Sequence, residues 1–180
     1  ILRNETRYTV RGKILQSQKI AIFAIYPETT TWESFFRAAI TLEELNYQVI
    51  CVVNSNAWSL MWVERIHEAG FTAIHRKNIG ADFGAYKLGI KILQEENIYQ
   101  ELSDLVLIND SIYFTPKSIA SLREIADSKN GYNCLYLHRQ SVAHAGSMLI
   151  RLDQKILQSK AFLRFWHKYY SYATKKKVIT

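Results

Sequence analysis

The feature that most constrains this fold is a regular alternation of short apolar runs with stretches of helical periodicity. Four apolar runs lie at residues 19–26, 47–53, 71–75 and 105–108, and two weaker ones at 132–137 and 147–151. Nearly continuous apolar runs are typical of strands buried on both faces of a parallel sheet. Strands that alternate with helices build βαβ units. The sequence therefore predicts an α/β fold, a Rossmann-like three-layer αβα domain with a mostly parallel central sheet.

Local signals mark where several elements begin and end. Thr30 with Glu33 fits a capping box before a helix, and Thr115-Pro116 is a helix-start signal. Gly70 suits the end of the second helix. Residues 1–18 are polar and lack a clear period, so we expect an N-terminal arm or a short hairpin there. No repeat or linker interrupts residues 19–180, which we expect to form one domain.

Composition excludes several classes of protein. The 180 residues are 48% hydrophobic and 22% charged, with 7 Gly and 2 Pro, which argues against a disordered chain. The two cysteines, Cys51 and Cys134, lie in apolar runs and are expected to be core thiols. They provide neither a disulfide framework nor zinc-ligand spacing. We therefore expect a cytoplasmic protein. No stretch reaches the length of a membrane span, about 18 apolar residues.

The net charge is +7, and much of it lies near the two ends of the sequence. One interpretation is that both ends are simply solvated. The other is peripheral contact with the inner face of the membrane. General nucleic-acid binding is disfavoured, because no aromatic-basic RNA motif is present. The basic residues in question are Arg3, Arg7, Arg11, Lys13, Lys19 and Lys175 to Lys177.

Polar residues follow four of the predicted strands. Each such cluster, taken alone, fits ordinary turn and capping chemistry. The carboxyl ends of parallel strands open on one edge of a sheet, however, and ligands bind in the crevice outside those ends. Together the clusters would line one crevice with amides, two cations and a carboxylate, which suits a nucleotide diphosphate. The clusters are Tyr26-Pro27, Asn54-Ser55-Asn56, Arg76-Lys77-Asn78 and Asn109-Asp110-Ser111.

Residues 76–86 are a second candidate for anion binding. Gly80 and Gly84 near a helix start would let backbone N–H groups approach an anion, and Arg76 and Lys77 add positive charge. The three-glycine dinucleotide fingerprint and the P-loop ending are both absent. The alternative is that these glycines only shape a tight turn.

Two segments in succession carry a resemblance to a known family. KNIGADFGAYKLGI, followed by DLVLINDSIYFTP, resembles the rhamnan synthesis protein F family, whose members are glycosyltransferases of bacterial cell-surface polysaccharide assembly. The stretch from His144 to Met148 and the later AFLRFW are also similar to that family. The resemblance extends from about Lys19 to the C-terminus. Its central positions are Asn78, Gly80, Asp82, Gly84, Asn109, Asp110, Ser111 and Pro116.

The wider resemblance is to inverting nucleotide-sugar transferases of the GT-A fold, and it implies roles for the polar clusters. Asn109-Asp110-Ser111 stands where such enzymes carry an Asp-x-Asp motif, so Asp110 would bind Mg²⁺ or Mn²⁺, with one carboxylate in place of two. Binding without a metal, through Arg76 and Lys77, is the alternative. The resemblance also implies a donor site: Tyr26 and Asn54 at the nucleoside, Arg76 or Lys77 at phosphate, Asn78, Gly80 and Asp82 shaping the pocket, and Asn109 and Ser111 at the ribose and donor sugar.

An inverting transferase needs a general base to take the proton of the acceptor hydroxyl. We take His144 as the candidate base, because it follows a strand-like run in a loop with Gly and Ser. Asp127, Asp153 and His138 are the other candidates, and Asp153 looks like a helix cap. The alternatives are that His144 is structural or that the base lies beyond Thr180.

These observations lead to one functional hypothesis and one rival. The first is a glycosyltransferase that moves rhamnose or another deoxyhexose from a nucleotide-diphosphate donor to a glycan or lipid-linked acceptor of the cell surface. The rival is a non-catalytic module with a GT-A-like pocket that binds or assembles without chemistry. The helix expected around Phe162, Phe165, Trp166 and Tyr169 is assigned to core packing, with an acceptor platform as the minority interpretation.

Overall fold

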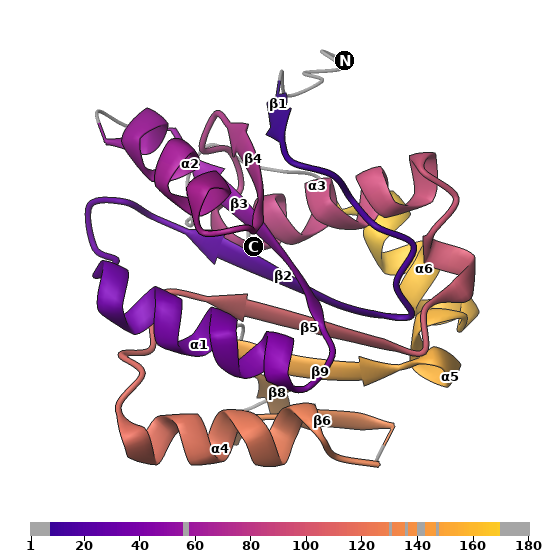
Figure 1. Ribbon diagram of the computed structural model, residues 1–180. Coiled ribbons are helices and arrows are strands. Elements are labelled where there is room, and N and C mark those ends of the chain that lie inside the picture. The colour runs from indigo at the N-terminus through magenta and orange to yellow at the C-terminus, as the bar shows by residue number, and fades with distance from the viewer. Residues whose placement is uncertain are drawn as a thin grey trace.

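The structure is a computed structural model that describes residues 8–55, 58–129, 131–135, 137–139, 143–146 and 148–169. It confirms the α/β class: Figure 1 shows a twisted sheet with helices on both of its sides. The strands of the main sheet are β1 (Tyr8–Arg11), β2 (Lys19–Ile25), β3 (Gln48–Asn54), β4 (Thr72–Arg76), β5 (Asp104–Asn109), β6 (Tyr132–Cys134) and β9 (Leu149–Asp153), and β7 (Leu137–Arg139) pairs with β8 (Ala143–Ala145). The helices are α1 (Trp32–Glu44), α2 (Ser59–Glu68), α3 (Ala81–Glu95), the 3₁₀ turn η1 (Tyr99–Glu101), α4 (Pro116–Ala126), α5 (Gln154–Leu157) and α6 (Lys160–Lys168).

The described part of the sheet is mixed rather than mostly parallel, which corrects the prediction. Its strand order is β1-β4-β3-β2-β5-β9-β6. The four central strands, β4, β3, β2 and β5, are parallel, but β1 runs antiparallel to β4, and β9 runs antiparallel to both β5 and β6. Antiparallel neighbours do not need a crossover helix between them. The helix–strand alternation of the sequence therefore identified the parallel centre but not the two edges.

The N-terminal segment contributes a strand where we expected an arm. Residues 8–11 add β1 to the edge of the sheet, with Tyr8 opposite Arg76 and Arg11 opposite Ala73. The side chains of this strand are exposed or half-buried. A largely exposed edge strand needs no apolar run, so the sequence pattern did not reveal it.

The helices divide into two layers. Helices α1, α2 and α4 cover one face of the sheet through side chains such as Phe35, Trp62 and Leu122. Helices α3 and α6 cover the other face through Tyr86 and Trp166, among others. Gly89 lets α3 lie close to β2, because a Cβ at that position would be 2.7 Å from Cδ1 of Ile22. Both faces of the central strands are thus buried, as the apolar runs predicted.

Several predicted boundaries are confirmed and others are wrong. Thr115 caps α4 in a capping box with Ser118, and Gly70 follows α2 with φ +92°. The predicted box of Thr30 with Glu33 does not form: Thr31 is the N-cap of α1 and makes no side-chain cap hydrogen bond. The run 132–137 is not one strand, because β6 ends at Cys134. Cys51 is buried as expected, but Cys134 is only half-buried.

The path of the chain creates a switch point between β2 and β5. After β2 the chain adds β3 and β4 on one side, and then crosses over to β5 on the other side of β2. Helix α1, which follows β2, lies on one face of the sheet, and α3, which precedes β5, lies on the other, so the winding of the chain reverses between β2 and β5. In open α/β sheets, this is where ligands bind.

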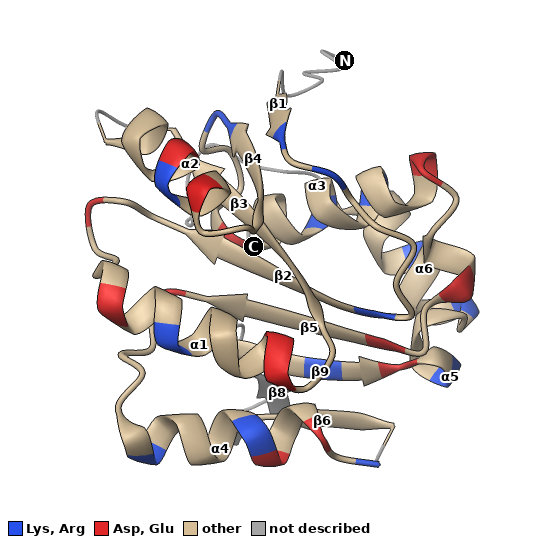
Figure 2. Ribbon diagram, in the orientation of Figure 1, with Lys and Arg blue, Asp and Glu red and all other residues tan. Residues whose placement is uncertain are grey.

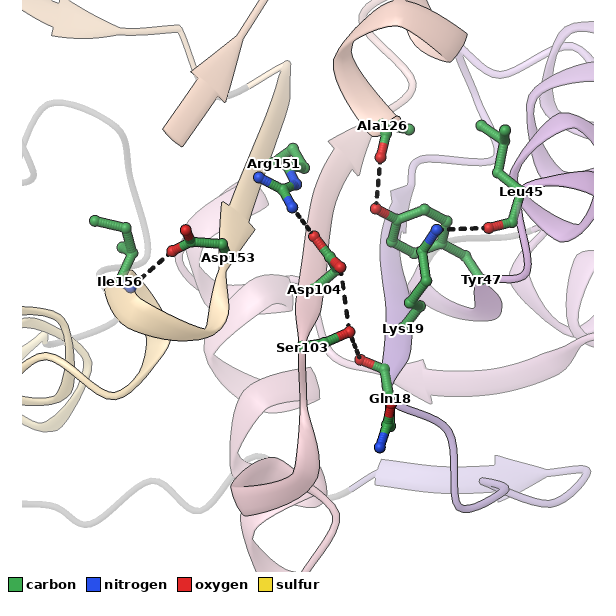
Figure 3. Close-up of polar contacts among 10 residues, drawn as sticks. All are labelled: Gln18, Lys19, Leu45, Tyr47, Ser103, Asp104, Ala126, Arg151, Asp153 and Ile156. Carbon is green, nitrogen blue, oxygen red and sulfur yellow. Dashed lines mark hydrogen bonds and ion pairs between the residues drawn. The ribbon is translucent and has the colours of Figure 1, made fainter. Parts of the chain in front are cut away.

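The opposite edge of the sheet, at the amino ends of β2 and β5, is closed by the chain's own polar contacts (Figure 3). Arg151 forms an ion pair with Asp104, and Lys19 donates from Nζ to the carbonyl of Leu45 at 2.7 Å. The Tyr47 hydroxyl donates to the carbonyl of Ala126 at 2.8 Å. These polar groups bond to other groups of the chain, so we assign this end of the sheet to the stability of the fold and not to ligand binding.

Candidate functional site

A carboxylate ties together the two loops at the switch point. The backbone N–H of Tyr26, just after β2, donates to Oδ2 of Asp110, just after β5, at 2.7 Å. The hydroxyl of Thr30 donates to the same oxygen, and that of Thr29 lies 3.4 Å from it. Sequence reasoning missed both threonines, because Thr30 also matched a capping box. Asp110 therefore fixes the loop between β2 and α1.

The environment of Asp110 favours its protonated form. Burial raises the pKa of the Asp110 carboxyl above its ordinary value, and the nearby charge of Asp82 adds to this. The hydrogen bonds from Thr30 and from the Tyr26 backbone oppose the increase but do not cancel it. A cation placed beside this carboxylate would remove much of the cost of its charge.

A second carboxylate reaches the site from the start of α3. Oδ2 of Asp82 accepts a hydrogen bond from Nδ2 of the buried Asn109 at 2.8 Å. Oδ1 of Asn109 accepts from the backbone N–H of Ser111 at 3.0 Å, which fixes the orientation of the amide. The charge of Asp82 raises the pKa of Asp110. A second carboxylate therefore lies beside the Asn109-Asp110-Ser111 segment, brought there from a position 27 residues away in sequence.

Arg76 is a buried cation at the end of β4. Its side chain is 2% exposed, and burial lowers the pKa of the guanidinium to about 10. Nη2 donates to the carbonyl of Ile79, while Nε and Nη1 have no hydrogen-bond partner among the described residues. A buried guanidinium with unpaired donors is costly to the fold. Such a group is expected where a ligand supplies the missing acceptors.

Two neighbouring strand ends carry further buried polar atoms without partners. Asn54 is 1% exposed and lies opposite Arg76 in the β3–β4 ladder. Its Nδ2 donates to the carbonyl of Ile25 at 3.2 Å, but within the described chain its Oδ1 has no partner. The buried hydroxyl of Tyr26 lies close to Asp82, a contact that falls short of hydrogen-bond geometry. Burial first, and then the charge of Asp82, raises the pKa of Tyr26.

The start of α3 has an unusual backbone. Gly80 (φ +81°) and Ala81 (φ +48°) are both left-handed, and the second of these is strained for a residue with a Cβ. A Cβ on Gly84 would lie 2.0 Å from the carbonyl oxygen of Ile79 and 3.0 Å from Nη2 of Arg76. Gly84 therefore allows this loop to close over Arg76. Tyr169 follows α6 and also reaches this loop, with its hydroxyl 3.5 Å from the carbonyl of Gly80.

The structure brings together most of the predicted site residues. Lys77 is exposed in the loop between β4 and α3. Asn78 is exposed in the same loop. The predicted residues at or next to the carboxyl ends of the four parallel strands and the start of α3 are Tyr26, Asn54, Arg76, Gly80, Asp82, Asn109, Asp110 and Ser111.

The candidate base is not placed by these contacts. The backbone of His144 lies in β8, opposite His138 of β7, and the side chain is outside the part of the chain that the structure describes. Asp153 caps α5, where its Oδ1 accepts from the N–H of Ile156 at 3.0 Å, as the sequence suggested. Asp127 follows α4 as its C-cap. His144 as the base therefore stays a prediction.

The acidic pair can serve a divalent cation only with help from a ligand. Among the described residues, no three His, Cys, Asp or Glu side chains group as a metal site. Mg²⁺, however, is commonly held by one or two carboxylates together with substrate phosphates. Asp82 and Asp110 are half-buried and their like charges repel each other, so this pair fits that smaller donor set.

Comparison with known proteins gives a relative but no function. No protein-family profile matches the chain. The chain is 29% identical over 175 residues to the uncharacterized protein y4gN of Sinorhizobium fredii, covering 93% of this chain and 44% of that protein. The chain thus spans less than half the length of this relative. Within the described residues, every helix is too short or too polar to cross a bilayer.

Proposed function

We propose that the protein is a glycosyltransferase of the GT-A type, or the donor-binding half of one, akin to the rhamnan synthesis protein F family. One observation carries the proposal: buried polar atoms of Asn54 and Arg76 lack partners in the described chain at the carboxyl ends of β3 and β4, on the side of the sheet where Asp82 and Asp110 also lie. A nucleotide-diphosphate sugar offers the matching groups, namely phosphate acceptors for the guanidinium and polar atoms for the amide. The sequence resemblance supports the same class of ligand.

The residues divide among the parts of the donor. Arg76 binds a phosphate through Nε and Nη1, with Lys77 as an exposed second cation. Tyr26 and Asn54 border the nucleoside. Asn78 and Gly80 shape the loop over the diphosphate, and the start of α3 directs its backbone N–H groups toward the anion. The side chains that contact the ribose and the donor sugar are Asn109 and Ser111.

Asp82 and Asp110 would hold Mg²⁺ or Mn²⁺ against the diphosphate. When bound, the cation offsets the negative charge that develops on the leaving diphosphate. Arg76 and the α3 amides act on the same charge from the protein. The reaction is displacement at the anomeric carbon of a deoxyhexose such as rhamnose, with His144 as the base that takes the acceptor proton.

The proposed acceptor is a growing cell-surface glycan or its lipid-linked precursor. Nucleotide sugars are cytoplasmic metabolites, so the reaction takes place in the cytoplasm, at the inner face of the membrane where a lipid-linked acceptor is found.

A specific observation favours the rival function, a non-catalytic donor-binding or assembly module. Oδ2 of Asp110 already accepts hydrogen bonds from Tyr26 and Thr30. This carboxylate therefore holds the loop between β2 and α1 in place, in addition to any role in metal binding. A chain that kept the pocket for binding alone would retain these contacts.

Calorimetric titration with dTDP, UDP and GDP, each with and without Mn²⁺, tests the donor site. We expect one nucleotide to bind, and Arg76→Met to weaken it by about tenfold or more, one charge-assisted hydrogen bond being worth about 1.5–3 kcal/mol. Asp82→Asn should remove the Mn²⁺ dependence. The matched control is Arg123→Met, which removes an exposed cation on α4. If none of the nucleotides binds, the donor-site proposal is wrong.

A second experiment separates the enzyme from the rival module. The protein is incubated with the sugar-bearing form of the nucleotide that binds, and nucleotide release is followed by chromatography. Release that rises on addition of a glycan acceptor supports the transferase. Tight binding without release supports the non-catalytic module.

A further inference from the structure

A groove between α3 and α6 gathers positive charge away from the donor site. Its volume is about 600 Å³, within the range of small-molecule sites. Lys87 and Lys91 of α3 form one wall, and Arg164 and His167 of α6 form the other. The three cationic side chains, Lys87, Lys91 and Arg164, lie on two facing helices and create a local potential that favours an anion.

The same groove has an apolar lining and a buried hydrogen-bond donor. Ile90, Leu163 and Trp166 line it between the cations. Trp166 is 6% exposed, and its Nε1 has no hydrogen-bond partner in the described part of the chain. Buried indole N–H groups normally find an acceptor. An apolar lining with cations and a spare donor suits a ligand that is both anionic and amphiphilic.

Little of this positive charge is neutralised within the described chain. Lys91 forms an exposed ion pair with Glu95 at 3.4 Å, while Lys87 donates to the carbonyl of Tyr169. Burial, followed by the charge of Lys91, lowers the pKa of Lys87. Arg164 has no ion-pair partner among the described residues, and Lys160–Lys168 contains no acidic residue. The groove therefore keeps a surplus of positive charge.

The outer surface of α6 combines this charge with exposed apolar side chains. Leu163 is 38% exposed and Phe165 is 47% exposed, beside the basic residues Lys160, Arg164 and Lys168. Figure 2 shows Lys and Arg on α3, α5 and α6, together with acidic residues at the end of α3. Helices that present basic and apolar side chains together are typical of binding to an anionic membrane surface.

We propose that the α3–α6 groove binds the phosphate headgroup of an anionic lipid, so that α6 rests on a negatively charged membrane surface. The exposed Leu163 and the outward part of Phe165, whose ring also packs against Phe83, Trp166 and Tyr169, favour a lipid over a soluble phosphate or a nucleic acid, because they would contact the acyl boundary of the bilayer. This inference extends the membrane location proposed above, and because the vesicle test uses no nucleotide, its failure is distinguishable from a failure of the donor-site proposal.

Vesicle co-sedimentation of the whole chain tests the proposal. We expect binding to phosphatidylcholine vesicles that contain phosphatidylglycerol, and none to phosphatidylcholine alone. Arg164→Glu should weaken binding by about tenfold or more, since each basic residue at an anionic membrane contributes about 1 kcal/mol and reversal counts twice. Lys117→Glu, the same charge change on α4, should bind like the wild type. Both positions are exposed, so neither change is expected to alter the fold.

Further arms distinguish the source of the anion. Phe165→Ser should weaken vesicle binding while leaving the affinity for inorganic phosphate unchanged. Equal vesicle binding by Arg164→Glu and Lys117→Glu would place the contact elsewhere and overturn the proposal. Binding of inorganic phosphate or of single-stranded DNA that depends on Arg164, without vesicle binding, would overturn it in favour of those ligands.

Discussion

At the scale of single residues, two buried arginines differ in whether a carboxylate neutralises their charge. Arg151 is paired with Asp104 at the closed edge of the sheet, whereas Arg76 has two unpartnered nitrogens, within the described chain, at the open edge. Removing one member of a buried ion pair leaves the other charge buried without a partner and lowers the free energy of unfolding by about 3–5 kcal/mol. Removing a buried cation without a counter-charge relieves desolvation and loses only the hydrogen bond to Ile79, about 1 kcal/mol.

We therefore expect Arg151→Met to lower the free energy of unfolding by about 3 kcal/mol or more, and Arg76→Met to change it by about 1 kcal/mol or less. Urea denaturation followed by circular dichroism measures both. Equal losses would show that Arg76 has a structural counter-charge, and its assignment to a ligand would then fail.

A second prediction at this scale concerns Asp110 and the pH dependence of the free energy of unfolding. The pKa of its carboxyl is raised in the folded state, mainly by burial, so the folded protein binds a proton more readily than the unfolded chain. Stability from this group is then complete below the ordinary carboxyl pKa and is lost as pH rises through the raised value. Asp110→Asn keeps an oxygen that can accept from Tyr26 and Thr30 but cannot ionise.

The unfolding free energy of Asp110→Asn, measured at intervals from about pH 4 to pH 7, should lack the decrease that ionisation of Asp110 causes in the wild type as pH rises. The difference between wild type and variant should shift steadily in favour of the variant as pH rises. A constant difference across the series would mean that the pKa of Asp110 is not raised by folding.

At the scale of elements, the start of α3 is the piece on which the site depends most. A methyl group on Gly84 would collide with the carbonyl oxygen of Ile79, a backbone atom that can move only with its loop. We expect Gly84→Ala to cost about 2 kcal/mol of stability and to weaken nucleotide binding, because the loop also holds Arg76. Thermal unfolding and calorimetric titration give the two quantities.

Gly70→Ala is the matched control for that loop. Gly70 has φ +92° but open space around its Cβ position, so alanine should cost about 1 kcal/mol through backbone strain and leave nucleotide binding intact. Loss of binding in both variants would mean that general destabilisation, not the loop over Arg76, is responsible.

The elements also show what the sequence could predict and what it could not. The runs that became β2, β3, β4 and β5 were readable because burial on both faces leaves an uninterrupted apolar signature. Asn109 and Asp110 were readable for the same reason, since they follow such a run directly. The pairing of Asp82 with Asn109 was not, because the separation of 27 residues is spanned by a helix and a crossover that no local period encodes.

At the scale of the whole molecule, the sheet has two unlike edges, and the β1 edge lies next to the site. β1 covers β4 along its length, with Tyr8 opposite Arg76. Without β1, β4 would become an unpaired edge strand beside the proposed donor site. Unpaired edges expose backbone donors and acceptors and promote pairing between molecules.

We therefore expect deletion of residues 1–12 to lower the free energy of unfolding by about 2 kcal/mol, from the loss of a few ladder hydrogen bonds. It should also weaken nucleotide binding, because the backbone that carries Arg76 loses its neighbour, and promote self-association through the bare β4 edge. Urea denaturation, calorimetry and sedimentation velocity measure the three effects.

Deletion of residues 1–7, which keeps β1, is the control and should leave all three near their wild-type values. If the shorter deletion has the same effects as the longer one, the β1–β4 ladder is not their cause. If the longer deletion weakens stability but not binding, β1 serves the fold alone and the site depends on β4 and α3 without it.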